Sequence, residues 1–150
     1  MKNLIEGYVY PFAGKITEFP IPGENNRNVH NGSFQYTTSN DHSWIHCDGS
    51  NNWAGILYMT PNAPLSSETG FYRYKDGTAC EDDEKIMNNK EELMNFCTDM
   101  TRWSLVDRVG NVFNRLVLFN SKRYHMSQDY FGNSKVNGRL FQVFFFSTEL

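Results

Sequence analysis

Short apolar runs recur along most of the chain at a spacing typical of β-strands. Eight of them are rich in aromatic and β-branched side chains, and they cover residues 33–38, 43–48, 53–60, 70–75, 102–107, 111–120, 122–127 and 139–146. Turn-forming pairs such as Gly110 with Asn111 and Asn137 with Gly138 separate neighbouring runs. The pattern predicts a mainly β chain, folded as an antiparallel sandwich or barrel.

Two other segments differ from this pattern in their composition. Residues 23–33 are dense in Gly and Asn, which predicts a loop that follows an N-terminal β-type segment. Residues 82–100 are charged and rich in helix formers, with apolar residues at three- and four-residue steps. Asn89 resembles an N-cap, so we expect one short helix near residues 90–99.

Length and charge narrow the class of protein. At 150 residues the chain has the size of one domain, and a single domain over residues 1–150 is expected. The formal charge of −3 gives no broad positive field, which disfavours nucleic acid as a partner. Neither a signal-peptide pattern nor an apolar run long enough to cross a bilayer is present. A soluble, cytoplasmic protein with no membrane partner is therefore expected.

The three cysteines are Cys47, Cys80 and Cys97. They are odd in number and lack CxxC spacing, which argues against both a disulfide framework and a thiolate zinc site. The expected compartment is therefore a reducing one.

The run at residues 43–48, SWIHCD, carries the first candidate chemistry. His46 and Asp48 lie two residues apart, and such residues project from the same face of a strand. Cys47, between them, is expected to point the other way and to be excluded from their site. His125, on a late β-like run, is the candidate for a third ligand. Two histidines and one carboxylate form the facial triad of non-haem iron(II) oxygenases, which leaves coordination positions open.

The spacing of His46 and Asp48 is a weak signal by itself, because it occurs often by chance. The two remaining histidines are not assigned to the site. His30 lies in the Asn-rich loop and is expected to be solvated. His42 precedes His46 by four residues, as in a helical zinc pair, but its β-like context argues against a helix there.

From Ser33 onward, the chain resembles the prolyl-4-hydroxylase-like branch of the iron(II)- and 2-oxoglutarate-dependent oxygenases. The resemblance is carried, in order, by Tyr36, Tyr58–Thr60, Thr69–Tyr72, His125 and Arg139, which follow the branch's pattern around its His-x-Asp. Sequence segments such as WAGILYMTPNAP and TGFYRY also resemble segments of uncharacterised oxygenase-like proteins of bacteria and phage. The resemblance implies a double-stranded β-helix, or jelly roll, in which His46, Asp48 and His125 hold iron.

Arg139 is the candidate for binding a co-substrate. On the predicted last strand it alternates with Phe141, Val143 and Phe145 onto one face. A planar guanidinium can pair a carboxylate through two hydrogen bonds, as a lysine cannot. By resemblance it would bind the C5 carboxylate of 2-oxoglutarate. Lys135 is a rival, but it lies among Gly, Asn and Ser in a predicted surface loop.

The resemblance also implies roles for three further residues. Tyr58 would support the same carboxylate, Tyr36 would line the pocket, and Ser127 is a candidate for an extra hydrogen bond. The N-terminal helices that usually buttress the larger sheet of the family are expected to be missing or much reduced. That expectation leaves room for a homo-oligomer.

The implied activity is that of a 2-oxoglutarate-dependent dioxygenase of the hydroxylase type, with Fe(II) as cofactor and 2-oxoglutarate and dioxygen as co-substrates. Asp48 favours hydroxylation, because the halogenating relatives need that position vacated for chloride. The substrate, a peptidyl residue or a small molecule, cannot be read from a shared fold and cofactor site.

Two alternatives stay open. One is an inactive jelly-roll binding or structural protein, and the cost of burying polar groups without partners argues against it. The other is a cupin-like metalloprotein that uses zinc or manganese without 2-oxoglutarate, which would have no need of Arg139. A Ser-His-Asp hydrolase is remote, because no GxSxG elbow is present.

Overall fold

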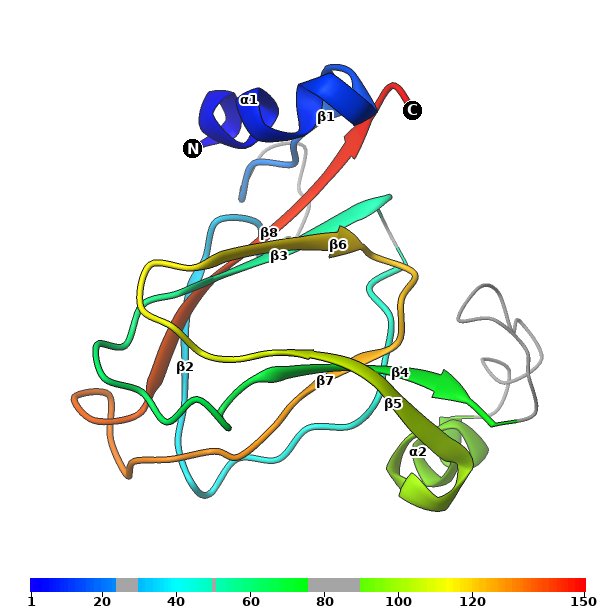
Figure 1. Cartoon of the computed structure of the whole chain (residues 1–150), viewed down its shortest axis with the longest axis vertical. Helices are drawn as coiled ribbons and strands as arrows, with labels where there is room; N and C mark the ends of the chain where they lie inside the picture. Colours follow the sequence, from blue (N-terminus) through cyan, green and yellow to red (C-terminus); the bar gives the residue numbers. More distant parts are fainter. Residues whose placement is uncertain (24–29, 50, 76–89) are drawn as a thin grey trace.

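The computed structural model describes residues 1–23, 30–49, 51–75 and 90–150, and of residues 90–93 only the backbone (Figure 1). Over these residues the chain is mainly β, with two antiparallel sheets and two α-helices. In chain order the elements are α1 (Lys2–Ala13), β1 (Ile16–Glu18), β2 (Phe34–Thr37), β3 (Trp53–Tyr58), β4 (Thr69–Tyr74), α2 (Lys90–Thr98), the 3₁₀ helix η2 (Met100–Arg102), β5 (Trp103–Val109), β6 (Leu116–Asn120), β7 (His125–Ser127) and β8 (Arg139–Thr148).

The long strand β8 organises the larger sheet. It pairs with β1 and β2 at its two ends and with β3 along most of its length, and β3 in turn pairs with β6. The smaller sheet has β4 between β5 and β7. Figure 1 shows β3, β6 and β8 as one layer and β4, β5 and β7 as a second layer facing it. The predicted antiparallel, mainly β chain is therefore confirmed.

Side chains of β8 alternate between the two faces of the larger sheet. Arg139, Phe141, Val143 and Phe145 line a cavity between the sheets, as the sequence predicts. Phe144 and Phe146 point to the opposite face, where α1 lies. Because directly paired residues of antiparallel strands share a face, the partner strands β2 and β3 also present alternate side chains, such as Thr37 and Ile56, to the cavity.

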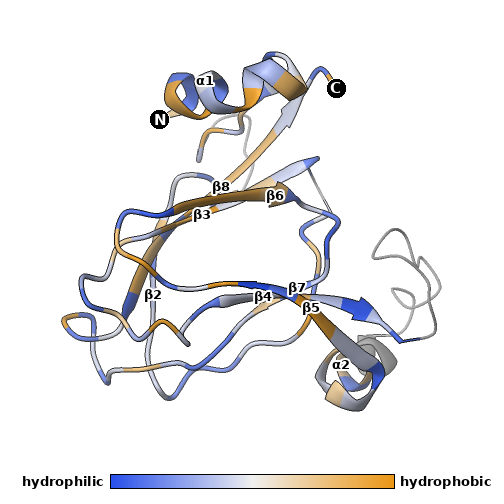
Figure 2. Cartoon of the chain, viewed as in Figure 1, coloured by the Kyte–Doolittle hydropathy of each residue, from blue (hydrophilic) through white to orange (hydrophobic). Residues whose placement is uncertain are grey.

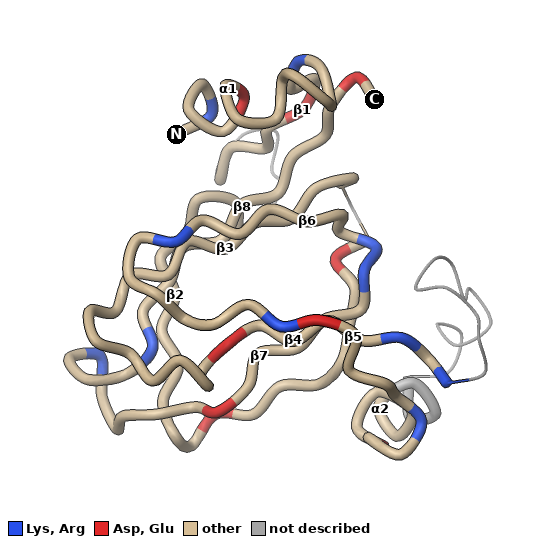
Figure 3. Tube along the Cα trace, in the orientation of Figure 1, with Lys and Arg blue, Asp and Glu red and all other residues tan. Residues whose placement is uncertain are grey.

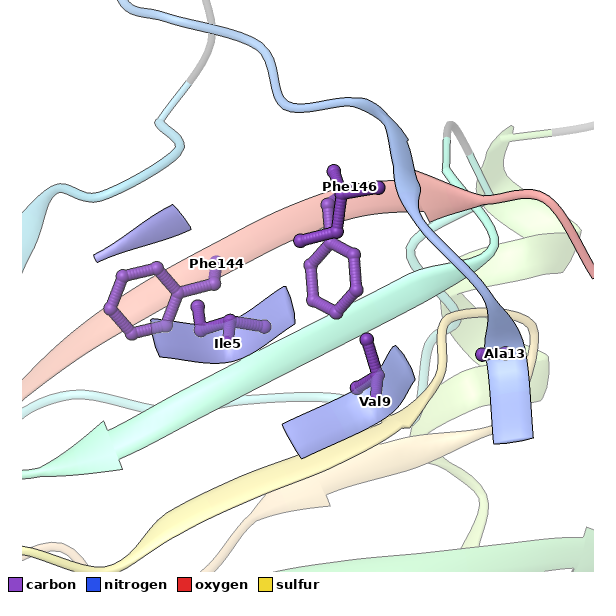
Figure 4. Close-up of a cluster of buried hydrophobic side chains, with 6 residues drawn as sticks. Ile5, Val9, Ala13, Phe144 and Phe146 are labelled. Atoms are coloured by element: carbon purple, nitrogen blue, oxygen red, sulfur yellow. The ribbon is translucent and has the colours of Figure 1, made fainter. Parts of the chain in front are cut away.

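The N-terminal stretch is a helix, where the sequence predicts a β-type segment. Ile5, Val9 and Ala13 follow one another at four-residue steps and pack against Phe144 and Phe146 (Figure 4). The many aromatic residues of this stretch masked its helical period, and the predicted strand character is limited to the three residues of β1. The outer face of the larger sheet therefore has a helical buttress, reduced to one helix rather than missing.

Seven of the eight predicted strands are present, several with shorter bounds. The exception is residues 43–48, which form a single isolated bridge between His46 and His125. Backbone amides of this segment bond to three separate places: Ile45 N donates to Cys97 O at 3.2 Å, His46 N to His125 O at 3.0 Å and Asp48 N to Ser121 O at 2.8 Å. A segment that bonds to three neighbours in turn cannot run along one partner as a strand.

The predicted short helix near residues 90–99 is confirmed as α2. Its Phe96 and Cys97 are buried beside Ile45, Tyr72 and Trp103, and Trp103 Nε1 donates a hydrogen bond to Phe96 O at 3.0 Å. The N-cap proposed at Asn89 lies outside the described residues. This cluster anchors the segment that leads into His46.

Hydrophobic residues concentrate in β6 and β8 of the larger sheet, whereas β4 ends in hydrophilic ones (Figure 2). Charged residues are sparse in the same sheet (Figure 3). Strands β3 and β6 have none, and β8 has Arg139 alone. A single cation is thus built into an otherwise uncharged stretch of sheet.

Candidate metal centre

His46 and His125 face each other across two backbone hydrogen bonds. His46 N donates to His125 O at 3.0 Å, and His125 N donates to His46 O at 2.8 Å. Directly paired residues project their side chains to the same side, and the two imidazole centroids are 4.4 Å apart. The bridge therefore brings together two histidines that are far apart in the sequence, as predicted.

The same hydrogen-bond arrangement orients both imidazoles. Nδ1 of His46 lies 2.8 Å from Trp44 O, and Nδ1 of His125 lies 2.9 Å from Arg123 O. A carbonyl oxygen only accepts, so each Nδ1 must carry the proton. The tautomer fixed in this way leaves each Nε2 with its lone pair, as in metal sites whose histidines are oriented by a backbone carbonyl.

Asp48 completes a compact group of three ligands. Its Oδ1 lies 3.9 Å from His46 Nε2, and its Oδ2 lies 3.3 Å from His125 Nε2. One ligand atom from each residue falls within 4.8 Å of the others. Two ligands about 2.1 Å from one ion lie about 3.0 Å apart at a right angle and about 3.4 Å apart at the tetrahedral angle. The Asp48–His125 distance already matches this spacing, whereas the Asp48–His46 distance is wider, so the side chains must draw closer together around a bound ion.

Cys47 is not part of this group, as predicted. It lies instead near Cys97 of α2. Burial raises the pKa of the Cys97 thiol, and the neighbouring Cys47 raises it further. A thiolate ligand from between His46 and Asp48 is therefore excluded.

The environment of His46 favours its neutral form. Partial burial lowers the pKa of His46, and the charge of a protonated His125 lowers it further. The hydrogen bond to Trp44 O and the carboxylate of Asp48 oppose the shift without cancelling it. Since a metal binds only the neutral imidazole, the lowered pKa widens the pH range over which His46 can act as a ligand.

The three ligands line a cavity of about 350 Å³ between the sheets. This volume is near the lower end of the range for small-molecule sites. Its apolar wall comes mainly from Ala54, Ile56, Phe119, Phe141, Val143 and Phe145. The cavity thus combines one cluster of candidate metal ligands with an apolar wall.

Arg139 lines the same cavity and is only 1% exposed. Its Cζ lies 4.8 Å from the ring centroid of Phe141 and 5.4 Å from that of Tyr58. Burial lowers the pKa of Arg139, and the phenol of Tyr58 opposes that shift. An arginine stays protonated in proteins, so a positive charge is buried here. Among the described residues, its Nε and Nη2 have no hydrogen-bond partner.

Of the two hydroxyl residues assigned to the co-substrate by resemblance, Ser127 lines the cavity, whereas Tyr58 does not line it but lies beside Arg139. Tyr58 is fully buried, and its Oη lies 2.7 Å from Thr69 Oγ1 and 3.2 Å from Val109 O. Ser127 lines the cavity two residues after His125, and its Oγ lies 2.5 Å from Tyr130 Oη. Both hydroxyls already have protein partners.

The expectation that Tyr36 lines the pocket is wrong. In the pairing of β2 with β8, Thr37 lies opposite Arg139 and Gln35 opposite Phe141, so these two residues face the cavity. Tyr36 alternates to the other face and is 45% exposed. Lys135, the rival of Arg139, stacks over the Tyr36 ring at 5.5 Å on that outer face. The register of β2 therefore turns Tyr36 away from the cavity, and Lys135 packs on it there.

Several lining residues were missed by the sequence analysis. Thr37 is the most telling, because its Oγ1 is buried with no hydrogen-bond partner in the described part of the chain. Strand alternation from Arg139 would have found it only if the pairing of β2 with β8 had been known. His30 is exposed, as expected, yet it lines the cavity, and so does His42.

Comparisons with known proteins leave the family open. No protein-family model matches the chain, and no curated protein shows significant similarity to it. No helix of the described residues is both long and apolar enough to span a membrane.

The site offers two complementary binding functions in one cavity. Two neutral imidazoles and a carboxylate can hold a divalent metal ion and leave coordination positions open for other ligands. The buried guanidinium can pair a carboxylate through two parallel hydrogen bonds. A small molecule with a metal-binding end and a carboxylate end would satisfy both.

Proposed function

We propose that this chain is an iron(II)- and 2-oxoglutarate-dependent dioxygenase of the hydroxylase type, built on a double-stranded β-helix. One observation carries the proposal. A His-Asp-His group and a buried arginine, whose Nε and Nη2 have no hydrogen-bond partner among the described residues, line the same cavity of about 350 Å³. Buried donor atoms without hydrogen-bond partners are costly, so they signal a ligand that supplies acceptors.

The residues present fit the proposed metal. Iron(II) in this class is held by two histidines and one carboxylate, and His46, Asp48 and His125 provide that set. Both imidazoles present Nε2 because their Nδ1 atoms are bonded to backbone carbonyls. Asp48 fills the carboxylate position, which supports hydroxylation rather than halogenation.

The residues also fit the proposed co-substrate. In the β2–β8 pairing, Thr37 lies opposite Arg139, and both side chains line the cavity. The Arg139 guanidinium would donate to the C5 carboxylate, and the Thr37 hydroxyl would donate a further hydrogen bond. The apolar wall formed by Phe141, Val143 and Phe145 would exclude water around the pair.

When bound, iron supplies the oxidation, in which 2-oxoglutarate and dioxygen give succinate and carbon dioxide and a substrate C–H bond becomes C–OH. The chain's own residues bind the metal and the co-substrate, orient them and shield them from water. His46, Asp48 and His125 would hold the metal at the wall of the cavity. Arg139 sets the orientation of the co-substrate.

The proposal is tested by turnover in the absence of a known substrate. Purified protein given iron(II), 2-oxoglutarate and dioxygen is expected to release succinate slowly, and His125→Ala is expected to abolish the release. A folded, metal-binding protein that releases none, with or without a panel of candidate substrates, would favour the inactive binding protein. Metal binding that 2-oxoglutarate leaves unchanged would favour the cupin-like alternative.

A further inference from the structure

A second hollow of about 410 Å³ adjoins the metal cavity. The two share three lining residues, His42, Ser43 and Ser127. We call the second hollow the outer groove. Its other lining residues are Tyr72, Met100, Met126, Gln128, Asp129 and Tyr130. The shared residues lie where the two hollows meet, so a ligand that occupies the outer groove can extend past them into the metal cavity.

The chemistry of the outer groove differs from that of the metal cavity. Two phenol rings and two thioethers give adaptable apolar contact surface. The rings are held by hydrogen bonds, since Gln128 Nε2 donates to Tyr72 Oη and Ser127 Oγ bonds to Tyr130 Oη at 2.5 Å. A groove whose rings are already fixed loses little conformational entropy when it binds a ligand.

The charged side chain that lines the outer groove is negative. Asp129 is exposed and is the one carboxylate among the described residues that line it, and no described Lys or Arg does so. The nearby Glu68 is outside the groove and lies 3.7 Å from Arg108 Nη1. A carboxylate beside two aromatic rings attracts a cation both by charge and by the negative faces of the rings.

We propose that the outer groove binds an elongated substrate that carries a positive charge, with the cation held by Asp129 and the apolar part passing Ser127 and His42 into the metal cavity. That the occupant is a substrate rests on the proposed function, whereas the cation site does not. The shared chemistry is an alkylammonium group, supplied either by a free amine or by a basic side chain of a peptide.

The test uses two probes of matched shape, 4-phenylbutylamine and 4-phenylbutanol, on metal-free protein without 2-oxoglutarate. We expect the amine to bind about fivefold more tightly than the alcohol, as a partly exposed ion pair allows. Asp129→Asn is expected to remove the preference for the amine and leave the affinity for the alcohol unchanged. Asp107→Asn, at an exposed carboxylate on β5, is the matched control and should keep the preference.

The place where the amine binds is determined by NMR of the protein with methyl-labelled methionines. On amine binding, the methyl signals of Met100 and Met126 should shift, whereas that of Met59, which does not line the groove, should not. Equal affinities for amine and alcohol, a preference that survives Asp129→Asn, or unshifted Met100 and Met126 signals would each overturn the proposal. Because neither metal nor 2-oxoglutarate is present, these outcomes are independent of the oxygenase proposal.

Two further experiments define how the bound amine is oriented and which kind of molecule supplies the cation. With paramagnetic Mn²⁺ bound at the triad, the phenyl protons of the amine should broaden more than the protons next to nitrogen, and the reverse order would overturn the orientation. Tighter binding of a capped Phe-Lys dipeptide than of the amine assigns the cation to a peptide, and weaker binding assigns it to a small molecule.

Discussion

Arg139 and Thr37 lie directly opposite each other where β2 pairs with β8, and both line the same cavity with polar atoms that no described residue hydrogen-bonds. The guanidinium contributes two donors and the hydroxyl a third. Such an arrangement is costly in the unliganded protein and favourable once a carboxylate is bound. It is the feature that separates this cavity from a simple metal site.

Removing the guanidinium should weaken co-substrate binding strongly and leave metal binding intact. We expect Arg139→Ala to weaken 2-oxoglutarate binding by about 3 kcal/mol, or roughly a hundredfold in Kd, because a buried charge pair is lost. Iron(II) affinity should stay unchanged, since Arg139 is not a ligand. Both are measured by anaerobic titration.

Lys135→Ala is the matched control, because Lys135 lies over Tyr36 on the outer face of β2. It should bind 2-oxoglutarate as the wild type does. A loss in Lys135→Ala with none in Arg139→Ala would reverse the assignment of the cation.

Thr37 offers a finer test of the same carboxylate site. Thr37→Val keeps the shape of the side chain and removes the hydroxyl, so Kd for 2-oxoglutarate should rise about fivefold, equivalent to about 1 kcal/mol. Unliganded stability should not fall, because the hydroxyl has no hydrogen-bond partner to lose in the described part of the chain. Tyr36→Phe, one residue away on the exposed face, should change neither quantity. An effect in Tyr36→Phe alone would restore the pocket role predicted from the sequence.

The lowered pKa of His46 predicts how metal-free stability depends on pH. An unfolded histidine titrates near about pH 6.5. Below that pH the unfolded chain takes up a proton that folded His46 resists, so the free energy of unfolding falls as pH drops from about 6.5 toward the lower folded value. Urea titrations at a series of pH values should show a flatter profile in His46→Gln than in the wild type. A steeper profile in the variant would mean that the shift has the opposite sign.

The contact between α1 and β8 should matter for stability and not for the site. Ile5 is fully buried against Phe144 and Phe146, so Ile5→Ala should cost about 3 kcal/mol in the free energy of unfolding. Leu4→Ala, at a half-exposed neighbour, should cost less than about 0.5 kcal/mol. Denaturant unfolding gives both values. Similar costs at the two positions would show that α1 does not pack on the sheet in solution.

The sequence predicted those features that depend on local periodicity. Alternation along β8 placed Arg139 with Phe141, Val143 and Phe145 on one face, and the two-residue step of His46 and Asp48 placed Cys47 outside the site. Both follow from the backbone geometry of an extended segment.

Features that depend on pairing between distant segments were not predicted. The register of β2 against β8 decides that Thr37, and not Tyr36, faces the cavity, and nothing local to residues 34–37 encodes that register. Residues 43–48 have strand-like composition, but their amides find three separate partners. Helix α1 was missed because its buried stripe is only three residues long within an aromatic-rich stretch.

The central claim is that one small molecule bridges the metal held by His46, Asp48 and His125 and the guanidinium of Arg139. Anaerobic addition of 2-oxoglutarate to the iron(II)-loaded protein tests it most directly, through the weak visible charge-transfer absorption of a 2-oxo acid chelated to iron(II). The band should appear in the wild type, at much higher 2-oxoglutarate concentration in Arg139→Ala, and not at all in His125→Ala. A folded, iron-loaded wild-type protein that shows no band at saturating 2-oxoglutarate would contradict the claim.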